Sequence, residues 1–523
     1  MLATVHSATL HGLDGRVVRV EVDVAPGLPG FSIVGLPDAA LQEARERVRG
    51  ALRNSGFVHP PRRITVNLAP ADLRKTGSTL DLAIAVAILL GSDQIRAGGR
   101  WALLGELSLG GEVRPVPGLL PMLAALARRG VRRAVVPAAA LPEARLVTAL
   151  ETIPAATLTE AVAILQTRRR RAGAEPKAPT RVELASDEPA REPSPLIEPA
   201  RAAVGPDLAD VRGQLEARRA LEIALAGGHG LLLIGPPGSG KTLLARTIPG
   251  LLPPLSDDEA LSATIVDSVA GERPVTGLVR TRPLRAPHHT ISYAGMVGGG
   301  PRLSPGEVTL ADQGVLFLDE LPEFERPVLE ALRQPLEEGR VAIVRVGRAM
   351  IFPARFQLVA AMNACPCGLS GVEGAVCSCP KEVASRYASR VSGPLRDRID
   401  LWVMMPRVPP QVLVGYDEPE ASAPVAARIG AARDVQLERA DELNARLAGR
   451  RLMAIAQVDA GTRERLATLA DHEVLSARGT ERLLRVARTI ADLEGAAVVR
   501  EHHLDEAARF RTPARRLREL AAG

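Results

Sequence analysis

The chain has 523 residues, of which 46% are hydrophobic and 2% aromatic, and it carries a formal net charge of +6. This length exceeds what one hydrophobic core can organise, so about three domains are expected. The basic balance permits a polyanionic partner, but so few aromatic side chains argue against a protein that stacks single-stranded bases. The longest apolar runs are too short to span a bilayer, and the N-terminus lacks the pattern of a signal peptide. We therefore expect a cytoplasmic protein.

Residues 1–167 have the pattern of a mixed α/β domain. Four valines alternate with charged residues between Val18 and Val24, which is the period of a half-buried strand. The further elements expected in this domain are strands over 63–70 and 132–137 and buried helices over 80–90 and 119–130.

The composition changes after this domain. Residues 168–206 are rich in proline and charge and poor in apolar residues, which predicts an extended linker. Strands alternating with helices are expected again over 207–408, followed by a connector over 409–440. Over 441–523 apolar residues recur at helical spacing, which predicts a helical domain.

The segment LLLIGPPGSGKTLLAR (231–246) joins an apolar strand to a helix through a glycine-rich loop. In that context the pattern G-x-x-x-x-G-K-T is typical of a phosphate-binding loop, because glycines let backbone N–H groups close around phosphate oxygens. The lysine would reach the β- and γ-phosphates of ATP, and the threonine would bind Mg²⁺. The residues expected at this site are Gly235, Pro236, Pro237, Gly238, Ser239, Gly240, Lys241 and Thr242.

Two further strands are expected to end in polar residues that serve the same site. The run GVLFLDE predicts a buried strand ending in Asp319 and Glu320. Asp319 would hold Mg²⁺ and Glu320 would orient and polarise the attacking water, since phosphoryl transfer depends mainly on positioning and charge neutralisation. The strand predicted over 356–364 ends at Asn363, whose amide can hold the lytic water or sense the γ-phosphate.

All four cysteines of the chain lie in MNACPCGLSGVEGAVCSCP (362–380). Cys-x-Cys occurs twice with proline and glycine between, which suits a turn that folds four thiolates onto one ion, and tetrahedral zinc is the natural occupant. The alternative is four unmetallated thiols in a loop. We expect a structural zinc site with the ligands Cys365, Cys367, Cys377 and Cys379.

Together these features resemble an AAA+ ATPase. The closer similarity is to the magnesium-chelatase-like AAA+ proteins of the ComM/YifB family, and it runs in order over nearly the whole chain apart from the proline-rich linker. The resemblance implies an α/β protein with an N-terminal Lon-protease-like domain, a parallel-sheet AAA+ core and a C-terminal helical lid. The segments that carry it are VNLAPADLRKTGSTLDLAIAVAIL, RAPHHTISYAGMVGGG, LPEFERPVLEALRQPLEEGRV, PARFQLVAAMNACPCG, SGPLRDRIDL and SARGTERLLRVARTIADLEG.

The resemblance also implies roles for individual residues. Asn363 matches sensor 1, and Arg398, in LRDRID, matches the arginine finger that reaches the γ-phosphate bound by a neighbouring subunit. Arg478, in SARGTER, matches sensor 2 on the helical lid. Arg390 and Arg396 are weaker candidates for the finger. Because a finger acts between copies, a homo-oligomeric ring is expected, hexameric by analogy with the family.

Two insertions are expected in this branch of AAA+ proteins. Residues 339–356 predict a hairpin that in related ring motors points into the pore. The other insertion, 285–307, carries His288 and His289, which could be metal ligands or pore residues but are expected to be hydrogen-bonded structural histidines. The hairpin arginines that could contact a phosphate backbone are Arg345, Arg348 and Arg355.

A Lon-type peptidase needs a desolvated lysine that activates a serine. In the matching motifs the serine position is Thr79 and the lysine position is Leu120, so no peptidase activity is expected. The leading hypothesis is an ATP-driven ring motor on single-stranded or branched DNA, a branch-migration helicase in recombination or natural transformation. The alternatives are a magnesium-chelatase-type motor that drives metal insertion with a partner, an ATPase acting on a protein, and a non-enzymatic ATP-binding scaffold.

Overall fold

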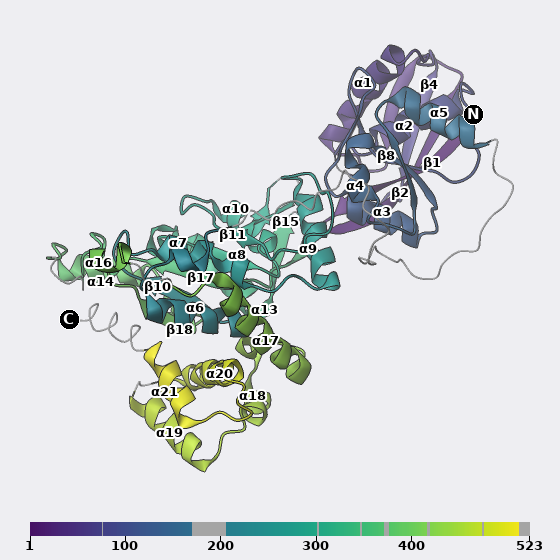
Figure 1. Cartoon of the computed structure of the whole chain (residues 1–523). Helices are drawn as coiled ribbons and strands as arrows, with labels where there is room; N and C mark the ends of the chain where they lie inside the picture. Colours follow the sequence, from purple (N-terminus) through teal and green to yellow (C-terminus); the bar gives the residue numbers. More distant parts are fainter. Residues whose placement is uncertain are drawn as a thin grey trace.

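Three bodies follow one another along the chain (Figure 1): an N-terminal α/β domain, a central α/β domain and a C-terminal group of helices, as expected. The computed structural model describes residues 1–511 apart from 76, 170–204, 301–302, 346–347, 371–375, 416–418 and 473–474. The linker predicted over 168–206 therefore falls mostly outside the described residues. Within the described part of the chain, no helix is both long enough and apolar enough to cross a bilayer.

The N-terminal domain is built on a seven-stranded sheet in the order β3-β4-β2-β1-β5-β8-β9. The four alternating valines lie on β2 and are buried, because a strand with one covered face directs every second side chain into the core. The elements of this domain are β1 (Leu2–His11), β2 (Asp14–Ala25), β3 (Gly30–Val34), α1 (Ala39–Asn54), β4 (Arg63–Ala69), α2 (Asp81–Gly91), β5 (Ala102–Leu103), β6 (Glu106–Leu107), β7 (Val113–Arg114), α3 (Leu119–Arg128), β8 (Arg133–Pro137), α4 (Leu141–Ala144), β9 (Glu151–Ala155) and α5 (Leu158–Arg169).

The central domain contains a five-stranded sheet in the order β11-β14-β17-β10-β18, in which every neighbouring pair is parallel. Its carboxyl ends therefore share one edge, and its amino ends share the other. The elements are α6 (Leu215–Gly227), β10 (Leu231–Ile234), α7 (Lys241–Arg246), α8 (Ile248–Leu251), α9 (Asp257–Ala270), β11 (Leu284–Arg285), α10 (Tyr293–Val297), β12 (Gly298–Gly299), β13 (Ser304–Pro305), α11 (Glu307–Leu310), β14 (Val315–Leu318), α12 (Arg326–Ala331), α13 (Arg333–Glu338), β15 (Arg340–Arg345), β16 (Arg348–Pro353), β17 (Gln357–Met362), α14 (Lys381–Ser389), α15 (Gly393–Arg396), β18 (Leu401–Met404) and α16 (Pro410–Leu413).

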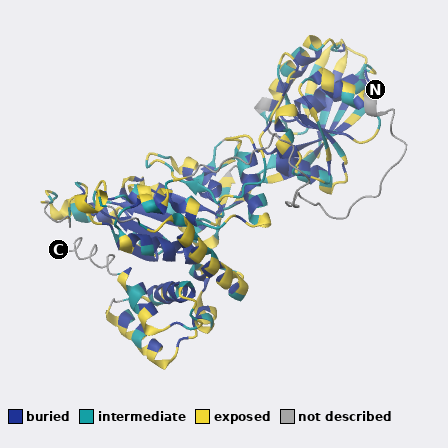
Figure 2. Ribbon diagram, viewed as in Figure 1, coloured by how far each residue is buried: buried dark blue, intermediate teal, exposed yellow. Residues whose placement is uncertain are grey.

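Two inner strands of this sheet, β10 and β14, are short, apolar and buried. β10 and β14 consist only of apolar residues, and each of these residues is buried (Figure 2), as expected of parallel strands covered by helices on both faces. The C-terminal helices are α17 (Ser422–Ala440), α18 (Gly449–Ala456), α19 (Ala460–His472), α20 (Ala477–Leu493) and α21 (Glu501–Arg509). Helix α17, inside the expected connector, shares one hydrophobic core with α6 and α20.

The hairpin predicted before Asn363 is present. Strands β15 and β16 pair antiparallel along their whole length, and the turn between them lies outside the described residues. Val341 and Phe352 are buried in the central core, whereas Val344 and Ile351 are 73% and 61% exposed. One face of the hairpin is therefore anchored, and the other faces away from the core.

Among the residues that the structure describes, the N-terminal domain contacts the central domain at α9 and at the hairpin. On α9 the Ser268 hydroxyl donates a 2.5 Å hydrogen bond to Glu143, and the Ser268 carbonyl accepts one from the Gly118 N–H at 2.7 Å. Burial raises the pKa of Glu143. At the second place the β1–β2 turn lies against the hairpin, since a Cβ atom added to Gly12 would stand 3.8 Å from Met350 Sδ. The N-terminal domain thus supports the hairpin from one side.

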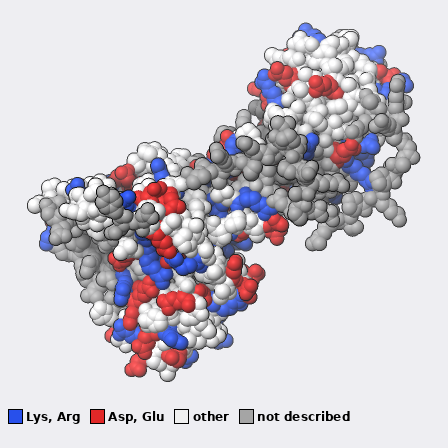
Figure 3. Space-filling model, viewed as in Figure 1, with Lys and Arg blue, Asp and Glu red and all other residues white. Residues whose placement is uncertain are grey.

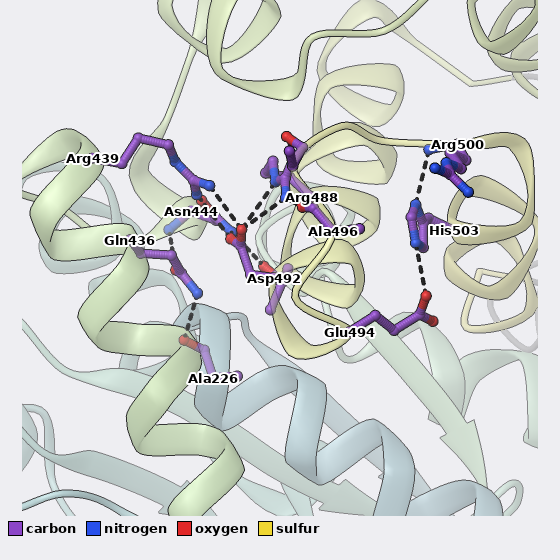
Figure 4. A network of polar contacts seen from close by, with 12 residues as sticks. Ala226, Gln436, Arg439, Asn444, Arg488, Asp492, Glu494, Ala496, Arg500 and His503 are labelled. Carbon is purple, nitrogen blue, oxygen red and sulfur yellow. Dashed lines mark hydrogen bonds and ion pairs between the residues drawn. The ribbon is translucent and has the colours of Figure 1, made fainter.

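A buried polar network joins the C-terminal helices to one another and to the central domain (Figure 4). Asp492 on α20 accepts hydrogen bonds from Arg488 at 2.9 Å and from Arg439 at 2.7 Å. Asn444 donates to the same carboxylate at 2.7 Å, and Gln436 donates to a carbonyl of α6 at 3.2 Å. Two guanidinium groups therefore converge on one buried carboxylate, which fixes α20 against α17.

Replacing that carboxylate should loosen α20. Asp492→Ala leaves Arg488 buried without its counter-charge, so we expect a loss of about 3–5 kcal/mol in local stability, measured as faster amide hydrogen exchange along α20. The control is Asp505→Ala, which removes a half-exposed ion pair with Arg465 at 2.7 Å and should cost at most about 1 kcal/mol. Equal protection of α20 in both variants would contradict this role of the network.

Candidate nucleotide-binding site

The phosphate-binding loop leaves β10 at the carboxyl edge of the central sheet and enters α7. Its glycines are required by the geometry: Gly238 and Gly240 have φ values of +77° and +91°, and a Cβ on Gly235 would lie 2.3 Å from the Met405 carbonyl oxygen. The Ser239 hydroxyl is buried and has no hydrogen-bond partner among the described residues. An unpartnered hydroxyl in a loop that opens a helix N-terminus fits a phosphate ligand.

Lys241 is held inside this loop. Its Nζ donates to the Gly235 and Pro236 carbonyls, both at 2.8 Å, and to the Asn363 amide oxygen at 3.2 Å. Burial lowers the pKa of Lys241, and the neighbouring carboxylates oppose that shift. The residue predicted to sense the γ-phosphate thus meets the lysine predicted to bind it.

Thr242, Asp319 and Glu320 meet beside the lysine. Thr242 Oγ1 donates to Asp319 Oδ2 at 2.6 Å, and the Glu320 N–H donates to Asp319 Oδ1 at 2.9 Å. Mg²⁺ prefers hard oxygen ligands of this kind, so Thr242 and Asp319 fit the metal that accompanies a nucleotide. Glu320 has a φ of +53°, which is rare for a residue other than glycine, and its side chain is 58% exposed. The carboxylate expected to polarise water is therefore accessible to water.

His289 is a partner of Glu320 that was not anticipated. Its Nδ1 lies 3.4 Å from Glu320 Oε2, and its ring lies 4.1 Å from that of His288, centroid to centroid. His288 bonds Thr290 Oγ1 at 2.9 Å, as expected of a structural histidine. The residues after β11 reach those after β14 because these strands are neighbours in the sheet. The order of strands in a sheet cannot be predicted from local patterns in one sequence, so this contact was missed.

Gln214 closes the phosphate-binding loop from another side, and no motif had indicated it. Its amide nitrogen donates to the Ser239 carbonyl at 3.1 Å and to the Pro406 carbonyl at 2.6 Å. One side chain thus joins the segment before α6, the loop itself and the segment after β18. These three segments are far apart in sequence, so local patterns could not reveal the contact.

Arg398 lies at the opposite edge of the sheet. The N–H groups of Asp400 and Leu401 both donate to the Gly230 carbonyl at 3.0 Å. Arg398 therefore lies before the amino end of β18, at the edge of the sheet where Gly230 lies before the amino end of β10. A strand rises about 3.3 Å per residue, so the length of the sheet separates Arg398 from the phosphate-binding loop of its own copy. Its guanidinium forms an ion pair with Glu337 on α13.

Arg478 belongs to the same side of the molecule. It is exposed in the first turn of α20. One turn later Arg482 donates to the Asp397 carbonyl, and its Nη2 lies 3.6 Å from the Asp397 carboxylate. The weaker finger candidate Arg390 instead pairs with Glu323 at 2.9 Å, shortly after the end of β14.

The four cysteines gather into one cluster. The sulfurs of Cys365, Cys367 and Cys377 are 3.4–3.6 Å apart, and those of all four, with Cys379, lie within 4.8 Å of one another. Four sulfurs bound tetrahedrally to zinc at 2.3 Å would be about 3.8 Å apart. The backbone N–H of Leu369 leads the hydrogen bonds that lower the pKa of Cys367 to about 6. The spacing and the donor set both fit zinc.

A second group of candidate ligands, just after α20 and on α21, has another role (Figure 4). The Arg500 N–H donates to His503 Nδ1 at 2.9 Å, and His503 Nε2 lies 3.0 Å from Glu494 Oε2. The ring proton must therefore be on Nε2, where a metal would have to bind. His503 caps α21, and its tautomer does not suit a metal ligand.

Family comparisons agree with this geometry. The domain family described as magnesium chelatase, subunit ChlI, matches residues 207–413. The family described as subunit ChlI of Mg-chelatase matches residues 20–140, and the family described as magnesium chelatase, subunit ChlI C-terminal, matches residues 419–511. The chain is 42% identical to the uncharacterized protein YifB of Salmonella typhimurium, over 98% of this chain and 97% of that protein. It is 41% identical to the competence protein ComM of Haemophilus influenzae, over 99% of both. The chain belongs to the ComM/YifB family of magnesium-chelatase-like AAA+ proteins.

Membership of the ComM/YifB family makes the chain an ATPase of that family, which uses a nucleotide and Mg²⁺. A more distant similarity, 24% identity over 26% of this chain and 45% of the relative, is to magnesium-chelatase subunit ChlI of Euglena gracilis. The loop around Lys241 and the pair Thr242 and Asp319 supply what those two ligands require.

The role of Glu320 can be separated from nucleotide binding. Glu320→Gln should keep the affinity for ATP but lower turnover by at least about 10²-fold, because an amide cannot act as the base that polarises water. Steady-state hydrolysis and equilibrium binding of ATP measure the two effects. Glu323→Gln, a nearby exposed change, should alter neither. Hydrolysis at the wild-type rate by Glu320→Gln would contradict the assignment.

Proposed function

We propose that this protein is a homo-oligomeric ring motor, hexameric by analogy with its family, whose ATP sites are each completed by the neighbouring copy. The observation that carries the proposal is the separation of two groups of residues across one sheet. Lys241, Glu320 and Asn363 follow the carboxyl ends of parallel strands, whereas Arg398 precedes an amino end. An arginine at that edge can reach a γ-phosphate only on another copy, as arginine fingers do.

In the isolated chain Arg398 is paired with Glu337, and its side chain is only 15% exposed. Its Nε–H, one of the five donors of a guanidinium, is buried without a hydrogen-bond partner among the described residues. In a ring, the phosphates of the neighbouring copy would compete with Glu337 for this group. Arg478, exposed one helical turn before the Arg482 that contacts Asp397, would act as sensor 2 from the same face.

We propose DNA, single-stranded or branched, as the substrate on which the ring moves, which would make the protein a branch-migration helicase in recombination or natural transformation. The support is the exposed face of the hairpin, the excess of basic residues and the similarity to a protein named for competence. Positive and negative residues are interspersed over the visible face of the central and C-terminal domains (Figure 3), so that face offers no broad basic surface. We propose the hairpin arginines Arg345, Arg348 and Arg355 for the phosphate contacts; the side chains of Arg345 and Arg348 lie outside the described part of the structure.

A metal-insertion motor is the second candidate, because all three matching domain families are named for magnesium chelatase. Such a motor would need a separate partner that binds the porphyrin. A peptidase is disfavoured: Thr79 and Leu120, at the positions of the dyad, are 8% and 1% exposed, and neither can serve as a general base.

We further propose that the cysteine cluster holds a structural Zn²⁺ and that the protein is cytoplasmic. Four thiols within bonding reach of one ion suit a reducing compartment, where clustered cysteines serve metals more often than disulfides. Zinc would supply no chemistry to ATP hydrolysis here; it would close the loop between Asn363 and α14.

Removal of the finger should stop turnover while leaving binding intact. Arg398→Ala is expected to lower the ATPase rate by roughly 10³–10⁵-fold and to leave the affinity for ATP largely unchanged, since the arginine contacts a neighbour's nucleotide. Arg463→Ala, an exposed arginine on α19, is the control. Loss of ATP binding together with turnover would point to a structural role of Arg398 instead.

The DNA proposal is tested by the ATPase rate with and without single-stranded and branched DNA. We expect stimulation that falls as salt is raised, because phosphate contacts release counterions. Arg345→Ala/Arg348→Ala should keep the basal rate and reduce the logarithmic salt slope of DNA affinity by about 2, and Arg463→Ala should not. An ATPase rate that does not respond to DNA would contradict the proposal.

A further inference from the structure

The turn that carries the first two cysteines lies directly against the phosphate-binding loop. Gly368 has a φ of +77°, and a Cβ atom added there would stand 2.4 Å from Pro237 Cδ and 2.9 Å from Pro237 Cγ. The Gly368 N–H donates to the Cys365 carbonyl at 3.0 Å. The backbone of the cysteine turn is thus packed on the loop that would surround the phosphates, without a side chain between them.

Both ends of the cysteine segment also lie near Asn363, the residue predicted to sense the γ-phosphate. Cys365 comes two positions after Asn363, whose amide accepts the bond from Lys241. Cys379 comes just before α14, and Tyr387 on that helix belongs to the same buried core as Ala364, the residue after Asn363. The segment therefore begins and ends at the same strand tip, beside the nucleotide site.

Two of the apolar side chains described in this segment are exposed. Among its described residues, Leu369 is 37% and Val376 88% exposed. Cys365, by contrast, is fully buried, and its sulfur accepts a hydrogen bond from the Ser370 N–H at 3.3 Å. A bond from each of the four sulfurs to one ion would therefore add strongly to the forces that keep the turn closed.

We propose that the metal held by the four cysteines sets the shape of the phosphate-binding loop, so that affinity for ATP depends on metal occupancy. The inference rests on the proposed zinc site and ATP site and assigns a regulatory link between them. Without the ion, no metal bonds hold the four sulfurs together, and the Cys365–Gly368 turn opens. Pro237 then loses the backbone surface of Gly368 on which it packs. Binding of the two ligands is then coupled, and the coupling is reciprocal.

The experiment uses the full-length protein purified anaerobically. Elemental analysis should find an amount of zinc equimolar with the protein. Affinity for a fluorescent, non-hydrolysable ATP analogue is then measured before zinc removal by a chelator, after it, and after zinc is restored. We expect roughly 5- to 150-fold weaker binding without zinc, the usual range of coupling between two sites, and recovery with Zn²⁺ but not with Mg²⁺. The ATP analogue should in turn make zinc harder to remove by the same factor.

Two variants keep the test independent of any unfolding caused by the chelator. Gly368→Ala keeps all four ligands but forces a methyl group into Pro237, so it should retain zinc and still bind the analogue more weakly. Gly430→Ala, on α17 with nothing within 4 Å of the added Cβ, should match the wild type in both respects.

The outcomes distinguish the inference from the proposals beneath it. Absence of zinc from the anaerobic protein would overturn the metal site, and failure of the zinc-loaded protein to bind the analogue would overturn the nucleotide site. Unchanged affinity after reversible zinc removal, or in Gly368→Ala, would overturn the coupling while leaving both sites in place.

Discussion

The account depends on one constraint, the common direction of the strands in the central sheet. Because all neighbouring pairs are parallel, everything that follows a strand lies on one edge, and everything that precedes a strand lies on the other. The phosphate-binding loop, the Asp319–Glu320 pair and Asn363 occupy the first edge. Arg398 occupies the second. The fold itself therefore keeps the two halves of the proposed catalytic site apart in each copy.

The same amino edge is linked to the C-terminal helices by buried polar contacts. His229 Nδ1 lies 3.2 Å from Asp400 Oδ2, and its Nε2 lies 2.8 Å from the hydroxyl of Thr489 on α20. Asn444 donates to that hydroxyl at 3.1 Å. His229 comes two residues before β10, and Asp400 comes two after Arg398. A rotation of α20 relative to the sheet would have to break or move these bonds, so the C-terminal helices and the Arg398 segment are mechanically connected.

Features encoded by neighbouring residues were predictable from the sequence. The strand that feeds the phosphate-binding loop, the polar residues at the strand tips, the hairpin of β15 and β16 and the convergence of four cysteines each follow from a local pattern. The contacts that were missed join residues distant in the chain: His289 with Glu320, Gln214 with Ser239, and Gly368 with Pro237. Such contacts depend on which strands are neighbours and on how closely two backbone segments approach. The spacing of residues along the sequence predicts neither of these.

The most direct test of the shared site is to mix two inactive variants. Glu320→Gln lacks the water-polarising carboxylate but keeps its arginine, whereas Arg398→Ala lacks the arginine but keeps the carboxylate. In randomly mixed rings one seam in four would pair an intact cradle with an intact arginine, so an equimolar mixture should recover about a quarter of the wild-type ATPase rate. If every mixing ratio stayed as inactive as the separate variants, catalysis between neighbouring copies would be contradicted.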